Sequence, residues 1–385
     1  MDARWFANPS ATPCDLPAKE RIALAQPIVR PAPRPTVRLA NLYFLTAVML
    51  SHALPRVVPP LGLAEIALTQ LLIFVALPLV VSLPAGRRAL PAIFRLRPVG
   101  PDLIGKSVLM AALGWVAVQG LSLLPLYLVS RLGGEPPNPY QPLLDQPLPR
   151  WALAGAIVLV PALAEEFAFR GFLLSGYGEL GSPRAWVWTG LLFGLAHMSL
   201  LRLPALAALG MVLSYVALRT GSILPTVVMH GLHNGITLGV YFLSRSAVPA
   251  GEMPTEVPLG MVLLWTAAAL VALPALVAVA RSLPRYPDPL VPWADGQATA
   301  SGQVRVGGRS AEVGAGGSDG QDAADGWSMQ GGAGGSDSQA GTGGPAGSLP
   351  GRDPGAWLSR WWPLAAVLLI YASYVAGELA MTFDR

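Results

Sequence analysis

Long apolar runs recur along the chain from residue 39 onward, separated by short polar segments. About 20 consecutive apolar residues are needed for a helix to cross a bilayer, and most of these runs approach or exceed that length. None shows the alternation of apolar and polar positions that is typical of a membrane barrel strand. The pattern therefore predicts nine membrane-spanning helices, near residues 39–55, 61–83, 104–130, 151–175, 184–202, 203–219, 222–243, 257–280 and 357–380.

Composition supports this assignment. Only 12% of the 385 residues are charged and the mean hydropathy is +0.50, whereas soluble domains carry about 25% charged residues. An ordinary cytosolic enzyme and a disordered protein are therefore excluded, and we expect an all-α, polytopic helical membrane protein in contact with the lipid bilayer. The single Cys14 excludes an internal disulfide framework and a multi-cysteine zinc site. The net charge of +4 is too small to indicate nucleic acid as a partner.

The segments outside the apolar runs define the organisation of the chain. Residues 1–38 are rich in proline and arginine, and we expect a disordered cytoplasmic arm. Residues 39–283 then form the transmembrane bundle. Residues 296–355 hold 19 of the 42 glycines, and such a composition cannot bury enough apolar surface to fold. Residues 284–356 are therefore predicted to be a Gly/Ser/Asp-rich flexible linker, followed by a C-terminal transmembrane helix in residues 357–385.

Basic residues orient the predicted helices, because cytoplasmic loops carry an excess of lysine and arginine. They are concentrated in three segments: the N-terminal arm, the loop after the second span and the loop after the eighth span. If each of the nine helices crosses the membrane once, these three segments lie on the same side. The sequence thus predicts a multi-pass cell (inner) membrane protein with its N-terminus cytoplasmic and its C-terminus outside. The bases are Arg4, Lys19, Arg21, Arg30, Arg34 and Arg38, then Arg87, Arg88, Arg95 and Arg97, then Arg281 and Arg285.

The fourth predicted span contains two carboxylates and a guanidinium, which are costly at membrane depth and mark functional sites by default. Glu166 and Arg170 are four residues apart in the favourable order for an ion pair. Glu165 lies about 100° further round the helix and can face a neighbouring helix. A carboxylate in such an apolar site can serve as a general base. A purely structural ion-pair cluster explains this segment equally well.

Three of the four histidines fall in the fifth and seventh predicted spans. His197 alone is more typical of a packing residue than of a catalyst. His230 and Asn234 share a helix face, with His233 near it, and a structural hydrogen-bond cluster is the alternative. At 1.5 Å per residue, Glu165, His197 and His230 lie about 14, 20 and 13 Å from the inner ends of their spans. These three side chains can therefore meet near the middle of the membrane.

Taken in order, three motifs on hydrophobic helices resemble the CPBP family. They are Glu-Glu-x-x-x-Arg from Glu165, Phe-x-x-x-His from Phe193, and His-x-x-x-Asn from His230. The family comprises CAAX-type prenyl proteases and bacteriocin-processing or immunity proteases, and is often called the ABI family. The resemblance is strong over residues 151–243, where each motif alone is weak but the ordered set is specific. The glycine-rich stretch and the ninth helix are additions to the family's core of about eight helices.

The resemblance implies an intramembrane endopeptidase that cleaves a peptide or membrane-protein substrate in a cavity open to the cytoplasm. Glu165 matches the catalytic glutamate that activates water, and His197 matches the histidine that assists it. His230 and Asn234 match the pair that stabilises the oxyanion. Structural support is assigned to Glu166, Arg170 and Phe193.

Metal dependence is left open by the sequence. Glu165, His197 and His230 match a common catalytic zinc set, with water as the fourth ligand. The family is often called a metalloprotease family, but a metal-free mechanism driven by glutamate has also been argued for it. The chain lacks His-Glu-x-x-His, and the spacing does not decide between zinc and no metal; the metal-free mechanism is slightly favoured.

Two other functions remain compatible with buried glutamate and histidine. A proton-coupled transporter uses such residues in proton relays, but the polar residues here gather in one block without the duplication typical of transporters. A non-catalytic membrane scaffold related to the proteases is the other alternative, and the complete motif set argues against it. The identity of the substrate is not encoded in any of these features.

Overall fold

The computed structural model describes residues 33–57, 61–135, 141–144, 146–247, 256–287 and 354–383. Within these ranges all regular secondary structure is helical, which confirms the all-α prediction. Most of the predicted arm (1–38) and of the predicted linker (284–356) lies outside the described residues.

Seven helices of the described ranges are long and apolar enough to cross a membrane, confirming a polytopic membrane protein. Two of the seven are interrupted by π-helical or 3-10 turns but run on as single rods. The seven are Val37–Val57 (α2), Leu63–Ala85 (α3, η3, α4 and η4), Pro101–Arg131 (α6), Arg150–Leu180 (α8, η5, α9, η6, α10 and η7), Leu203–Thr220 (α12), Leu259–Arg281 (within α14, Leu259–Ser282) and Trp357–Phe383 (within α15, Pro354–Phe383).

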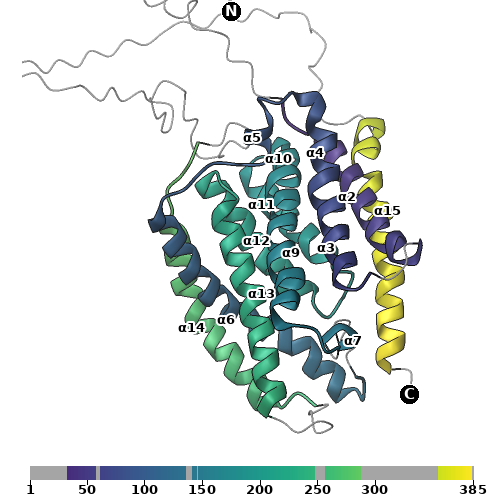
Figure 1. The fold of residues 1–385 in the computed structure, drawn as a ribbon, viewed down its shortest axis with the longest axis vertical. Coiled ribbons are helices and arrows are strands. Elements are labelled where there is room, and N and C mark those ends of the chain that lie inside the picture. The colour runs from purple at the N-terminus through teal and green to yellow at the C-terminus, as the bar shows by residue number, and fades with distance from the viewer. Residues whose placement is uncertain are drawn as a thin grey trace, which may run out of the picture.

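Two further long helices complete the bundle, α11 (Ser182–Leu195) and α13 (Leu224–Ala247). In the middle of the bundle lie α9 (Val160–Glu166), α11, α12 and α13 (Figure 1). The tilted pair α6 and α14 packs on one side of α13, and α15 packs beside α2 at the opposite edge of the molecule (Figure 1). The short helices α5 (Leu90–Ile93) and α7 (Gln141–Leu144) lie in the connections.

The predicted fifth span, residues 184–202, is wrong at its C-terminal end. Helix α11 stops at Leu195, and residues 196–202 form a loop in which Met198 adopts a left-handed backbone with φ of 47°. At 1.5 Å per residue, 14 residues span about 21 Å, less than the roughly 30 Å of a hydrocarbon core. Helix α11 by itself is therefore too short to cross a hydrocarbon core. Hydropathy could not reveal this break, because the loop itself carries Met198, Leu200 and Leu201.

The crossing of α11 and α12 depends on two glycines. A Cβ atom at Gly190 would lie 2.5 Å from the backbone nitrogen of Met211, and one at Gly210 would lie 2.8 Å from the carbonyl oxygen of Gly190. Both contacts are far inside van der Waals range, and both involve backbone that cannot rotate away. The two helices thus touch backbone to backbone at this point, as small residues allow in membrane bundles.

Gly190→Ala is expected to lower the Tm of the purified protein, because the new methyl group forces α11 and α12 apart. Overpacking of this kind costs about 1–3 kcal/mol. Thermal unfolding in detergent measures the effect. Gly105→Ala on α6 is the matched control, since a Cβ there meets nothing within 4 Å. An unchanged Tm for Gly190→Ala would contradict the tight crossing.

Candidate active site

The two carboxylates lie at the C-terminal end of α9, in the middle of the Arg150–Leu180 rod. Wider π-helical turns flank them, η5 (Gly155–Leu159) before and η6 (Phe167–Leu173) after. Pro161 has no N–H group, so it cannot make the regular backbone hydrogen bond of an α-helix. This accounts for the irregular helical hydrogen bonding near η5. Such π-turns are frequent at functional sites, and the sequence pattern did not reveal them.

Glu166 is the centre of a buried ion cluster. Its Oε1 atom accepts hydrogen bonds from Arg170 Nη1 at 2.8 Å and from His230 Nδ1 at 2.9 Å. The side chains of Glu166, Arg170 and His230 are 0%, 0% and 3% exposed. Arg170 also donates through Nη2 to the carbonyl oxygen of Gly210 at 3.1 Å. The predicted Glu166–Arg170 pair thus forms. The ion cluster around it links the Arg150–Leu180 helix to α12 and α13.

Glu165 stands apart from this cluster. Its side chain is 8% exposed, and its Oε1 atom accepts a hydrogen bond of 3.0 Å from Gln70 Nε2 on α3 (Leu63–Leu71). The expectation that Glu165 faces another helix is confirmed. Sequence reasoning missed Gln70, although a glutamine in an otherwise apolar span was a visible signal. Glu166 rather than Glu165 is paired with Arg170, so Glu165 lies outside the ion cluster.

His197 lies in the loop just beyond α11, not within a helix as predicted. It is half-buried, and its Nδ1 atom lies 2.8 Å from the carbonyl oxygen of Phe193. A carbonyl can only accept, so Nδ1 carries the proton and Nε2 offers a lone pair. Glu165 and His230 are both close enough to His197 to act on it electrostatically. His197 therefore lies within electrostatic range of both other predicted catalytic side chains.

Phe193 is the apolar centre of this group. Its ring meets His197 edge-on at 5.1 Å and His230 at 5.5 Å between ring centroids. The guanidinium of Arg170 lies 4.4 Å from the centroid of the same ring. The ring of Phe193 thus packs against both imidazoles and the ion cluster, and its supporting role stays a prediction. Asn234 is half-buried one helical turn beyond His230 and makes no side-chain hydrogen bond with the described residues.

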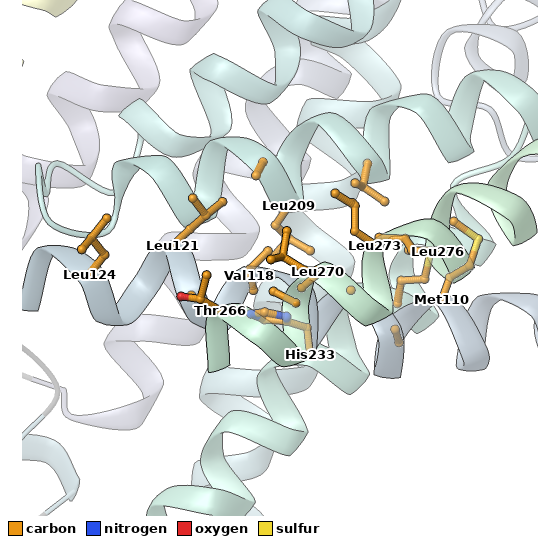
Figure 2. A pocket seen from close by; sticks show the side chains of 18 residues that line it. Met110, Val118, Leu121, Leu124, Leu209, His233, Thr266, Leu270, Leu273 and Leu276 are labelled. Atoms are coloured by element: carbon orange, nitrogen blue, oxygen red, sulfur yellow. The ribbon is translucent and has the colours of Figure 1, made fainter. Parts of the chain in front are cut away.

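His233 does not belong to this group. It lines a separate apolar cavity of about 340 Å³ between α6, α12, α13 and α14 (Figure 2). Its neighbours there include Val118, Leu270 and Thr266 (Figure 2). Its Nδ1 atom is buried without a hydrogen-bond partner in the part of the chain that the structure describes. The sequence placed His233 near the face of His230, whereas it turns towards α6 and α14.

Arg95 is a second residue whose contribution the sequence did not reveal. It was counted as a loop cation that orients the bundle, but its side chain is buried. Its Nη1 atom donates to the carbonyl oxygen of Arg170 at 2.7 Å and to Ser175 Oγ at 2.8 Å. Arg95 thus braces the π-turn that carries Arg170.

A preformed three-ligand metal site does not fit the residues that the structure describes. Among them, no group of three or more His, Cys, Asp or Glu side chains is arranged to hold a metal ion. His230 uses Nδ1 for Glu166 and His197 uses Nδ1 for a carbonyl, which leaves only Nε2 of each ring to offer a lone pair.

Comparison with known proteins agrees with the resemblance seen in the motifs. Residues 147–236 match the family model described as Type II CAAX prenyl endopeptidase Rce1-like. This segment contains Glu165, Glu166, His197, His230 and Asn234. No curated protein and no solved structure matches the chain. Residues 147–236 of this membrane protein are thus similar to an Rce1-like domain of the CAAX protease type, in agreement with the CPBP resemblance that the three motifs carry.

Proposed function

We propose that the chain is an intramembrane endopeptidase that hydrolyses a peptide bond in a peptide or membrane-protein substrate, with water activated by Glu165. One observation carries the proposal: Glu165 is buried, separate from the ion cluster of Glu166, and within electrostatic range of His197. The Rce1-like segment supports the reaction class. The arrangement of basic loops favours a cavity that opens to the cytoplasm.

The steps follow from what each side chain can donate or accept. Glu165 takes a proton from water as the water oxygen adds to the carbonyl carbon of the substrate, and Nε2 of His197 orients that water by accepting its other hydrogen. The C–N bond then breaks, and Glu165 returns its proton to the leaving amine. The products are one new carboxylic acid and one new amine; transfer of the acid's proton to the amine then gives a carboxylate and an ammonium, so atoms and protons balance.

The developing oxyanion needs donors that are already in place. The amide of Asn234 can donate directly. His230 holds its Nδ1 proton against Glu166, so it can donate to the oxyanion through Nε2 only when that nitrogen carries a proton as well. The buried partners Glu166 and Arg170 fix His230, which is the preorganisation that this kind of catalysis requires.

Hydrolysis by protein in proteoliposomes tests the proposal. The substrates are two peptides with a C-terminal C-a-a-X sequence, one farnesylated and one not, incubated in ¹⁸O-labelled water. We expect cleavage with one ¹⁸O atom in the new carboxylate, and mass spectrometry measures it. His233→Ala is the matched control and should cleave at the wild-type rate, because His233 faces the separate cavity. If neither peptide is cleaved and the proteoliposomes show a solute flux that depends on a pH gradient, the protease function would be rejected in favour of a proton-coupled transporter.

Removal of metal is expected to leave the cleavage rate within about twofold of the untreated protein. The reason is that the described residues do not assemble three metal ligands. Metal content measured by mass spectrometry, with activity before and after dialysis against a chelator, gives the answer. Loss of activity that returns on adding zinc alone would contradict the glutamate-driven mechanism.

A further inference from the structure

The loop that carries His197 is held by a helix from the far end of the chain. Glu378 on α15 is 9% exposed, and its carboxylate accepts a hydrogen bond from Ser199 Oγ at 2.5 Å and another from the backbone N–H of Leu200 at 2.7 Å. These residues follow His197 by two and three positions. The matched Rce1-like segment ends at residue 236, so α15 lies wholly outside it.

We propose that Glu378 is a positioning residue, which holds the 196–202 loop so that His197 stays beside Glu165. This inference rests on the proposed function. It assigns α15 a task in the active site, in place of the expectation that the ninth helix is merely an addition to the bundle.

The depth of the loop gives the first argument. Because α11 is only 14 residues long, it cannot cross a hydrocarbon core of roughly 30 Å by itself, and we infer that the loop after it lies within that core. Irregular backbone is tolerated at that depth only where protein groups, or water in a cavity, satisfy its hydrogen bonds. Glu378 satisfies the N–H of Leu200 and the hydroxyl of Ser199, and charge-assisted bonds of this kind are stronger than neutral ones.

The conformation of the loop gives the second argument. Met198, between His197 and Ser199, has a positive φ that a non-glycine residue adopts only when its surroundings hold it there. Arg202 closes the loop on itself, with its N–H donating to Ser199 Oγ at 3.3 Å and Nη2 donating to the carbonyl oxygen of His197 at 3.4 Å. Ser199 therefore joins Glu378 to the turn that presents His197.

The docking of α15 is secured along its length, which gives the third argument. Near its N-terminal end, the carbonyl oxygen of Arg360 accepts a hydrogen bond of 2.8 Å from Asn41 Nδ2 on α2. Near its C-terminal end, the carbonyl oxygen of Thr382 accepts one of 3.0 Å from the N–H of Glu135. Trp361 packs against Trp188 at 5.4 Å between ring centroids. A helix anchored at both ends can hold a carboxylate in a fixed place.

The test compares Glu378→Ala with Glu378→Gln and Arg360→Ala. We expect Glu378→Ala to lower kcat about tenfold or more with KM unchanged, because a small misplacement of a catalytic group costs rate rather than binding. Glu378→Gln should recover a large part of kcat, since the amide oxygen still accepts from Leu200. Arg360→Ala should match the wild type: it removes a 3.9 Å ion pair with Glu179 at the other end of the same helix.

A second readout does not depend on activity. The chain has four histidines, so ¹³C-labelled histidine gives four ring signals that His→Ala variants assign. Glu378→Ala should shift or broaden the His197 signal and leave that of His230 in place. If the wild type cleaves no peptide, the proposed function fails while the His197 signal still decides the role of Glu378. An unchanged His197 signal in Glu378→Ala, or an unchanged kcat in an active enzyme, would overturn the positioning role.

Discussion

Glu165→Gln is expected to slow peptide cleavage by a factor of about 10²–10⁴, the usual contribution of a general base. The amide is nearly isosteric with the carboxylate and still accepts a hydrogen bond from Gln70, so the packing of α9 against α3 is preserved. The amide cannot take a proton from water, so the substitution removes the general base and leaves substrate binding unchanged. Measured rates should show a fall in kcat with little change in KM.

Two controls separate this loss of chemistry from a loss of structure. Glu165→Gln should keep the Tm of the wild type, because it leaves the ion cluster of Glu166 untouched. Gln70→Leu removes the donor to Glu165 but keeps the base, so its rate should fall far less than that of Glu165→Gln. Cleavage by Glu165→Gln at the wild-type rate would remove Glu165 from the mechanism.

Local features of the site follow from the sequence because they depend on helix geometry alone. The i,i+4 spacing of Glu166 and Arg170 was sufficient to predict their ion pair, and the same geometry separated Glu165 from it. Apolar length was sufficient to locate the helices, including α15. These inferences use interactions within one helix, where a period of 3.6 residues fixes which side chains meet.

The contacts that complete the site could not be predicted, because each joins segments far apart in the chain. Gln70 is 95 residues from Glu165, Arg95 is 75 from Arg170, and Glu378 is 179 from Ser199. No periodicity relates such pairs; only the packing of the bundle brings them together. The break after α11 was hidden for a different reason, since its loop is nearly as apolar as the helix. An apolar run indicates depth in the membrane but does not distinguish helix from buried turn.

Glu166→Ala is expected to destabilise the protein by about 3–5 kcal/mol, the cost of leaving a buried charge without its partner. Arg170 and His230 both bond to Glu166, and neither side chain is more than 3% exposed. Water cannot replace the lost carboxylate at this depth. Thermal unfolding in detergent, together with the amount of folded protein recovered from membranes, measures the effect.

A matched control and a double variant identify burial of charge as the cause of this loss. Asp102 and Lys106 on α6 form another i,i+4 pair, at 3.0 Å, but Asp102 is 76% exposed, so Asp102→Ala should cost at most about 0.5 kcal/mol. Glu166→Ala combined with Arg170→Met removes both charges, and its loss should be clearly smaller than the sum of the two single losses. Strict additivity would show that Glu166 and Arg170 act independently, and that an unpaired buried charge is not the cause of the loss.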